Sequence, residues 1–195
     1  MCHYCRQGDA DGTFVRQGGG IWVVMGVRPA VLALGSNLGD RQDILQGAVD
    51  AVAGIEGVRL TGVSPAYETV PVGGPPQPDY LNAVVLADIS IPSDELLDRV
   101  HEIEAAFDRV RAVRWGPRTL DIDIVTVAGE RSDNPDLTLP HPRAHERAFV
   151  LAPWHDVDPG AVLPGYGPVA DLLALADQTG IRRSGMPLVI QEAGS

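Results

Sequence analysis

The sequence predicts an α+β fold: a ferredoxin-like split βαββαβ antiparallel sheet with helices packed on it, plus a C-terminal helical extension. Short apolar runs typical of strands alternate with segments of helical spacing in the order β-α-β-β-α-β. Further helical segments follow, one from about residue 144 and one from about 169 to 176. The chain has 195 residues and is 45% hydrophobic, so it suits one globular domain.

The first half of this order begins with a buried strand at residues 31–34, which the run Gly-Ser-Asn-Leu-Gly ends. Asp40 can cap the helix that follows, because its carboxylate can accept hydrogen bonds from the first turn. A second strand is expected from Val58 to about Tyr67. Residues 65–79 contain five prolines and two glycines, which predicts a lid or binding loop rather than a simple connection.

The second half continues with a strand from Tyr80 to Ala87 and a second helix. Ser93 can cap this helix, and Asp94 and Glu95 in its first turn suit the positive end of the helix dipole. A fourth strand ends at about Val127. The sheet would then carry helices on one face and leave the other face available for a ligand.

The domain boundaries follow from composition. We expect residues 1–28 to be a disordered N-terminal extension, with Met25 as an alternative start. Residues 29–195 are expected to form a single domain whose tail after about residue 180 is loosely ordered. No apolar run approaches the roughly 20 residues of a membrane span, so we expect a cytoplasmic protein with no membrane contact.

The charged residues exclude several functions. The net charge is −11, which argues against a general nucleic-acid or membrane-surface role. All 15 basic residues are arginine, so the chain lacks the lysine of a P-loop, of a protein kinase and of a Schiff base. Four of the 15 arginines lie between residues 109 and 118, so the acidic protein keeps a local basic pocket.

Two carboxylates lie two residues apart in the fourth strand. Asp121 and Asp123 should point to one side of it, while Leu120, Ile122 and Ile124 point into the core. Carboxylate oxygens about 4 Å apart repel by roughly 4 kcal/mol at an effective dielectric constant near 20, which bound cations would relieve. The arginines at 109, 111, 114 and 118 could grip a polyphosphate held by those cations. The alternative is a solvated strand edge with ordinary salt bridges.

Four segments together resemble one enzyme family. They are LGSNLGDR at residues 34–41, QPDYLNA at 77–83, residues 109–123, and LPHP at 139–142 continuing to RAF at 147–149. On these residues the chain is similar to the 6-hydroxymethyl-7,8-dihydropterin pyrophosphokinases of folate biosynthesis, over nearly all of residues 30–160. The third segment is the most specific of the four.

The resemblance implies transfer of pyrophosphate from ATP to the hydroxymethyl group of the reduced pterin, with release of AMP. It implies ATP as co-substrate and two Mg²⁺ ions held by Asp121 and Asp123. Catalytic roles carry over to Arg109 and Arg118, with Arg111 and Trp115 completing the site. The arginines could instead form ion pairs with the acidic residues at 102, 104 and 108.

Other family positions imply the two binding sites. Pterin-binding roles fall on Thr69, Val72, Tyr80, Asn82 and Phe149, with the two aromatic rings stacking on the pterin. The alternative for Tyr80 and Phe149 is core packing. The ATP-binding positions are His101, Glu104, Arg109, Arg111, Arg114, Trp115, Arg118, Ile124, Leu137, Thr138, His141 and Arg147.

The chain departs from the family pattern at three positions. His101 replaces a frequent glutamine and Val70 a frequent proline. Asp136 stands where some members carry an arginine, so we expect ATP to bind more weakly or with other contacts. None of these departures involves the two carboxylates of the fourth strand.

Two other functions fit parts of the pattern. A nucleotidyl or glycosyl transferase could use the same Asp-x-Asp, but it would not need Tyr80 and Asn82. A non-catalytic ligand-binding domain would gain nothing from four arginines beside two carboxylates. We expect a monomer that could associate with other folate-pathway enzymes, with loops 65–79 and 108–118 closing over ATP.

Overall fold

The computed structural model describes residues 14–17, 20–23, 26–71, 76–107 and 119–191. Within these residues the centre of the molecule is a six-stranded antiparallel sheet, ordered β12-β5-β6-β3-β7, with β4 paired to β6. Its strands are β3 (Arg28–Ser36), β4 (Val58–Val63), β5 (Tyr67–Thr69), β6 (Tyr80–Ile89), β7 (Asp121–Val127) and β12 (Ile181–Arg183).

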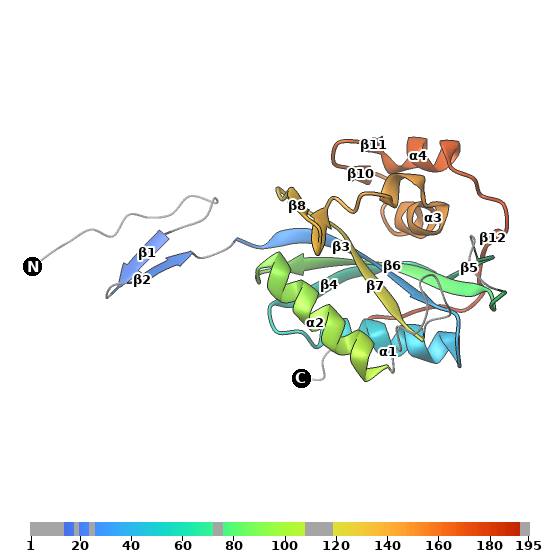
Figure 1. Ribbon diagram of the computed structural model, residues 1–195, viewed down its shortest axis with the longest axis horizontal. Helices are drawn as coiled ribbons and strands as arrows, with labels where there is room; N and C mark the ends of the chain where they lie inside the picture. The colour runs from blue at the N-terminus through green and yellow to red at the C-terminus, as the bar shows by residue number, and fades with distance from the viewer. Residues whose placement is uncertain (1–13, 18–19, 24–25, 72–75, 108–118, 192–195) are drawn as a thin grey trace, which may run out of the picture.

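Helices cover both faces of this sheet (Figure 1). α1 (Arg41–Ala53) and α2 (Ser93–Ala106) pack on one face, and α3 (Ala148–Val157) and α4 (Val169–Leu175) lie over the other. The predicted α+β class and the C-terminal helical extension are confirmed. The more specific ferredoxin-like assignment stays a prediction.

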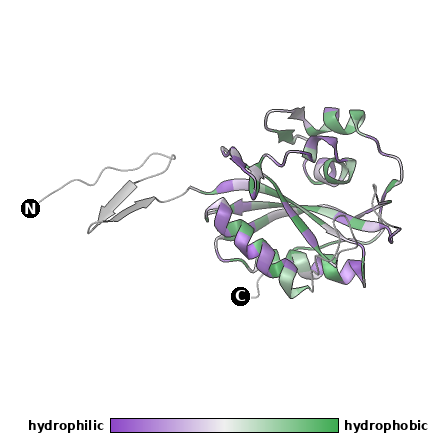
Figure 2. Ribbon diagram, viewed as in Figure 1, coloured by the Kyte–Doolittle hydropathy of each residue, from purple (hydrophilic) through white to green (hydrophobic). Residues whose placement is uncertain are grey.

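Two hydrophobic clusters fill the spaces between these layers, because successive residues of a strand point to opposite faces. On β3, Leu32 packs in the cluster with α1 and α2, whereas Val31 packs in the cluster with α3. Trp154 of α3 is buried in the second cluster. The expectation of one free face is therefore wrong over the middle of the sheet. Figure 2 shows the corresponding apolar and polar bands on α1 and α2.

Shorter elements complete the described chain. β1 (Phe14–Gln17) and β2 (Gly20–Val23) pair as a separate hairpin, apart from the main body in Figure 1. The others are β8 (Ser132–Asn134), β9 (Leu137–Leu139), a 3₁₀ turn (Ala144–Glu146), β10 (Val162–Leu163) and β11 (Gly167–Pro168). No helix in the described ranges is long and apolar enough to cross a membrane.

The N-termini of α1 and α2 show whether the two predicted helix caps form. Asp40 caps α1 as expected, because its Oδ1 accepts from the backbone N–H of Asp43 at 3.2 Å. Ser93 does not cap α2: it is the first helical residue, after Pro92, and its hydroxyl donates to Glu130 at 2.5 Å. Sequence alone does not place Glu130 beside Ser93, since 37 residues separate them.

The strands also differ from the prediction around the proline-rich loop. The second strand ends at Val63 rather than Tyr67, and β5 forms within the predicted loop. β5 is short, and it is held between β6 and β12. In the segment after residue 180, β12 pairs with β5, and Leu188 is only 6% exposed.

Candidate active site

A pocket of about 400 Å³ opens where the sheet is not covered by α3. Its floor is a row across three strands: Asn82 of β6 lies opposite Gly35 of β3, which lies opposite Asp121 of β7. The walls come from β5, from the region around the 3₁₀ turn, and from the segment after α4. Besides the floor, the pocket lining includes Thr69, Val70, Gln77, Tyr80, Asp123, Arg143, Glu146, Arg147, Phe149, Asp177, Thr179 and Ile181.

The two carboxylates of β7 face this pocket as predicted. Asp121 and Asp123 line it, whereas Leu120, Ile122 and Ile124 are at most 5% exposed on the core side. The strand alternation thus separates the charged face from the apolar face. The described residues hold no group of three or more His, Cys, Asp or Glu side chains that could form a complete metal site.

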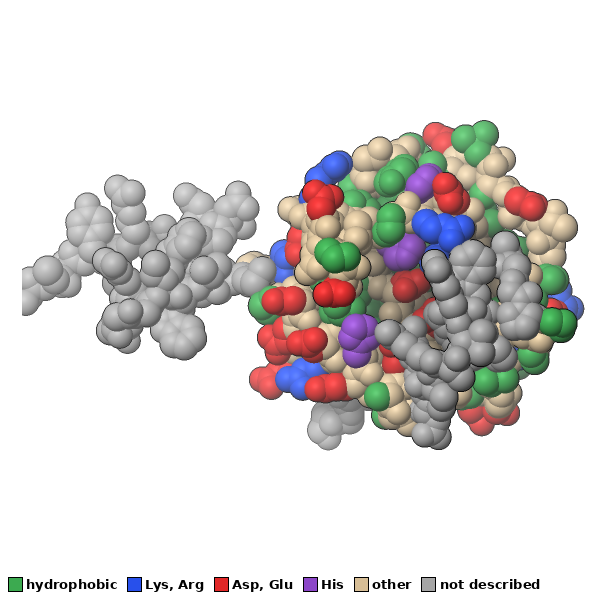
Figure 3. Space-filling model, viewed as in Figure 1, with side chains coloured by type: hydrophobic (Ala, Val, Ile, Leu, Met, Phe, Trp, Pro, Cys, Tyr) green, Lys and Arg blue, Asp and Glu red, His purple; other side chains and the backbone are tan. Residues whose placement is uncertain are grey.

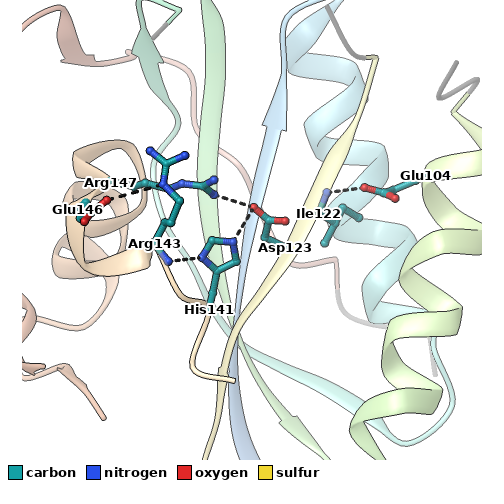
Figure 4. A network of polar contacts seen from close by, with 7 residues as sticks. All are labelled: Glu104, Ile122, Asp123, His141, Arg143, Glu146 and Arg147. Atoms are coloured by element: carbon teal, nitrogen blue, oxygen red, sulfur yellow. Dashed lines mark hydrogen bonds and ion pairs between the residues drawn. The ribbon is translucent and has the colours of Figure 1, made fainter. Parts of the chain in front are cut away.

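Basic residues meet Asp123 from the chain that follows β9 (Figure 4). Arg147 donates from Nη1 to Asp123 Oδ2 at 3.0 Å, and His141 Nε2 lies 3.9 Å from the same oxygen. Burial lowers the pKa of His141 below its usual value; nearby Asp123 opposes this effect and Arg147 adds to it. At neutral pH the imidazole of His141 is therefore neutral, and it lies just outside the pocket lining, beside the carboxylate that Arg147 pairs with.

A second ion pair lies beside this group. Arg143 Nε is 3.7 Å from Glu146 Oε2, and the backbone N–H of Arg143 donates to His141 Nδ1 at 3.2 Å. His145 Nε2 is 3.4 Å from Glu146 Oε1. Acidic, basic and histidine side chains gather near the middle of the face shown in Figure 3. This end of the pocket is suited to a highly charged ligand.

The opposite end of the pocket carries a buried amide. Asn82 Nδ2 donates to Thr69 Oγ1 at 2.7 Å, and both residues are at most 6% exposed. This bond fixes the amide plane of Asn82, whose donor and acceptor atoms could read the edge of a heterocycle. Gly35 leaves room beside it, because a Cβ there would lie 3.0 Å from Asn82 Oδ1.

Two aromatic side chains line the same pocket. The hydroxyl of Tyr80 donates to Gln77 Oε1 at 3.2 Å, and Asn37 donates to the same oxygen at 3.0 Å. Phe149 lies under Arg147, whose guanidinium carbon is 5.5 Å from the ring centroid. The structure thus brings both predicted aromatic residues to the pocket, where Phe149 also packs against the second hydrophobic cluster.

Several predicted nucleotide-binding residues lie elsewhere in the described structure. Glu104 is 2% exposed on the far side of β7, where it accepts from the backbone N–H of Ile122 at 2.8 Å (Figure 4). That bond satisfies a buried donor, which is a structural role. Outside the pocket lining, Ile124 and Leu137 are in the core, Thr138 donates to the Asn134 carbonyl, and His101 is exposed. Their ATP contacts stay predictions.

The remaining predicted residues lie outside the described part of the chain. These are Arg109, Arg111, Arg114, Trp115, Arg118 and Val72. The same is true of loop 108–118 and of the centre of loop 65–79, residues 72–75. Loop closure therefore stays a prediction.

Sequence reasoning missed some lining residues. Arg143 and Glu146 lie between the motifs LPHP at 139–142 and RAF at 147–149. Their charges, close in sequence to His141, could have indicated that they line the pocket. Gln77 lines the pocket and begins the motif QPDYLNA, but the family resemblance did not assign it a binding role. Asp177 and Thr179 carried no signal, because nothing local shows that the chain returns to β5.

Together, fold and pocket define an α+β domain in which one cavity joins a charged end to an aromatic and amide end. A profile of the 7,8-dihydro-6-hydroxymethylpterin-pyrophosphokinase (HPPK) family matches residues 31–159. The chain belongs to this family.

Curated relatives agree with that assignment. The 2-amino-4-hydroxy-6-hydroxymethyldihydropteridine pyrophosphokinase of Methylorubrum extorquens is 42% identical over 154 residues, covering 79% of this chain and 97% of the relative. The enzyme of the same name from Pseudomonas aeruginosa is 40% identical, covering 80% and 97%. That of Mycobacterium tuberculosis H37Rv is 46% identical, covering 74% and 81%.

Solved structures support the fold. A Plasmodium falciparum HPPK-DHPS triple mutant crystallised with pteroate superposes with a TM-score of 0.59 at 15% identity, covering 80% of this chain. The wild-type protein with pterin and p-hydroxybenzoate gives the same TM-score of 0.59. This chain spans 46% and 45% of those longer chains, so their likeness concerns the fold alone.

Proposed function

We propose that this chain transfers the pyrophosphoryl group of ATP to the hydroxymethyl oxygen of 6-hydroxymethyl-7,8-dihydropterin, giving AMP and the pterin diphosphate in folate biosynthesis. One observation supports this reaction independently of family membership. The row Asn82–Gly35–Asp121 puts a buried amide and a carboxylate in one cavity, which supports a site for a flat heterocycle beside a site for phosphates. A transfer reaction needs this adjacency, because donor and acceptor must meet within bonding distance.

The pterin binds at the end formed by Thr69, Asn82 and the aromatic rings of Tyr80 and Phe149. Each ring face that stacks on a heterocycle contributes about 1–3 kcal/mol. The amide of Asn82, oriented by Thr69, matches donors and acceptors on the pterin edge. The hydroxymethyl group then points along the floor toward Asp121.

The phosphates of ATP bind at the end formed by Asp121, Asp123 and Arg147. Arg147 exchanges its bond to Asp123 for phosphate oxygens, and Arg143 adds positive charge at the rim. Attack on the β-phosphorus releases AMP, so charge must be balanced on both sides of that atom. Arg109 and Arg118 are proposed to act there as well, by family resemblance.

Mg²⁺ fits the two carboxylates of β7. Magnesium sites use one or two carboxylates and leave the other positions to substrate phosphates and water, so a pair of Asp residues is a sufficient protein donor set. When bound, the ions would neutralise charge on the phosphate oxygens. Asp121 and Asp123 would hold them from one face of the strand. We also propose that the enzyme works in the cytoplasm as a monomer.

Release of AMP tests the function. The protein is incubated with ATP and Mg²⁺, with and without the reduced pterin, and the nucleotides are separated by chromatography. AMP should form only when the pterin is present. AMP formation without pterin would show hydrolysis of ATP and contradict transfer to the pterin, and binding without turnover would favour a non-catalytic domain.

A further inference from the structure

The segment after α4 forms one wall of the pocket, although it lies beyond residues 31–159 that the family profile matches. Asp177, Thr179 and Ile181 line the cavity. β12 pairs with the outer edge of β5, with Ile181 opposite Thr69. This segment therefore supports the same wall from which Thr69 accepts the hydrogen bond of Asn82.

The contact continues past the end of both strands. The backbone N–H of Val70 donates to the carbonyl of Gly180 at 3.3 Å. Gly180 has φ +73°, and a Cβ there would lie 2.8 Å from Cγ2 of Val70. Only glycine allows both this backbone conformation and this close approach without a shift of Val70.

Charged residues connect β12 through β5 with the chain directly before Tyr80. Arg182 pairs with Glu68 of β5, whose other carboxylate oxygen lies 3.1 Å from Arg41 Nη2. Arg41 also donates to the carbonyl of Asp79 at 2.9 Å, directly before Tyr80. The chain of contacts thus reaches from the C-terminal strand to a residue beside the stacking ring.

The chain beyond β12 is tied to α1, which keeps the strand in place. Gln46 donates to the Val189 carbonyl at 2.8 Å and accepts from the Val189 N–H at 3.0 Å. Gln42 donates to the Pro187 carbonyl at 2.8 Å. Leu188 between them is buried in the main cluster. β12 is therefore anchored by packing as well as by its ladder.

We propose that Gly180 and β12 position the pterin-binding wall, and that Gly180 is a positioning residue for pterin recognition. The proposal rests on the function proposed above. By holding Thr69 and Val70, the segment sets the orientation of the Asn82 amide and the width of the pocket beside it. The phosphate end is built from β7 and the 3₁₀ turn instead, so the effect should be selective for the pterin.

Gly180→Ala tests this in the full-length enzyme, with Gly185→Ala as the matched control. An added Cβ at Gly185 meets no atom within 4 Å, and this glycine has no positive φ. Two quantities are compared: KM for each substrate, and the Kd of 6-hydroxymethylpterin in the absence of ATP, measured by the fluorescence of the pterin. In Gly180→Ala both pterin constants should rise about tenfold, since small misplacements in a site cost this much or more. KM for ATP and kcat should stay within about twofold in both variants.

A milder variant guards against a folding defect. Arg182→Gln removes the exposed ion pair to Glu68 but keeps Gly180, and we expect about a threefold rise in KM for the pterin alone. If circular dichroism shows that Gly180→Ala is unfolded, the pterin constants of Arg182→Gln test the positioning role instead. Unchanged pterin constants in a folded variant, or an equal rise in both KM values, overturn the positioning role. An inactive wild type would instead overturn the proposed function, so wild-type turnover is measured first.

Discussion

Arg147 donates a hydrogen bond to Oδ2 of Asp123 at 3.0 Å, inside the pocket. Each side chain thereby neutralises the charge of the other. A cation at Asp123 and phosphates at Arg147 would replace this pair by two separate ionic contacts. The ion pair thus keeps both charges oriented toward the positions that we propose for metal and nucleotide.

Asp123→Ala should lower kcat by about 10³-fold while the protein stays folded, because loss of a metal ligand removes several kcal/mol of transition-state stabilisation. Steady-state AMP release measures the effect, and circular dichroism checks the fold. Asp133→Ala, an exposed aspartate on β8, serves as control and should keep wild-type activity. Near-normal turnover in Asp123→Ala would refute the metal assignment.

Thr69→Val should weaken both stability and pterin binding. The substitution keeps the shape of the side chain but leaves Asn82 Nδ2 buried without its 2.7 Å acceptor. An unsatisfied buried donor costs about 1–3 kcal/mol of unfolding free energy, measurable by urea denaturation. Thr61→Val on the exposed side of β4 is the matched control. Equal stability of the two variants would show that the bond to Thr69 is not important.

Gly35→Ala should raise KM for the pterin while leaving KM for ATP nearly unchanged. The new Cβ would lie 3.0 Å from Asn82 Oδ1, so the amide must move away from the orientation in which it hydrogen-bonds the pterin edge. We expect a five- to tenfold effect, about 1–1.4 kcal/mol. Gly160→Ala, whose Cβ would make an ordinary 3.6 Å contact, controls for the general effect of the substitution. A selective rise in KM for ATP would contradict the assignment of the two ends.

Tyr67 gives a prediction at alkaline pH. Burial, with the hydrogen bond that its hydroxyl donates to Asp156 at 2.8 Å, raises the pKa of Tyr67 from 10.0 to about 12. A pKa raised in the folded state stabilises the fold below pH 10, and this contribution is lost as pH rises from 10 to about 12. The unfolding free energy of the wild type should therefore fall more steeply in this range than that of Tyr67→Phe. Parallel curves would contradict the shift.

The local patterns of the sequence were sufficient for four strands of the sheet, β3, β4, β6 and β7, and for the face of β7. Strict alternation from Leu120 to Ile124 indicated which side chains enter the core, and the structure confirms it. The cap at Asp40 was also predictable, because its partner lies three residues away. These features, which depend on neighbours in sequence, were thus predicted correctly.

Features that depend on distant partners were not predicted. Ser93 bonds to Glu130, and β5 needs β12 from more than a hundred residues later to form its outer pairing. The carboxylate of Glu104, whose ATP contact stays a prediction, accepts from a backbone N–H of β7 on the core side, 18 residues along the chain. In each case the deciding contact is tertiary, and no local pattern encodes it.

Label transfer tests the central claim most directly. The enzyme, Mg²⁺ and 6-hydroxymethyl-7,8-dihydropterin are incubated with ATP labelled separately in the β- or the γ-phosphate, and the products are separated. Both labels should appear on the pterin in equal amounts, and AMP should carry neither. Label in ADP, or only the γ-label on the pterin, would show a different transfer and contradict the account.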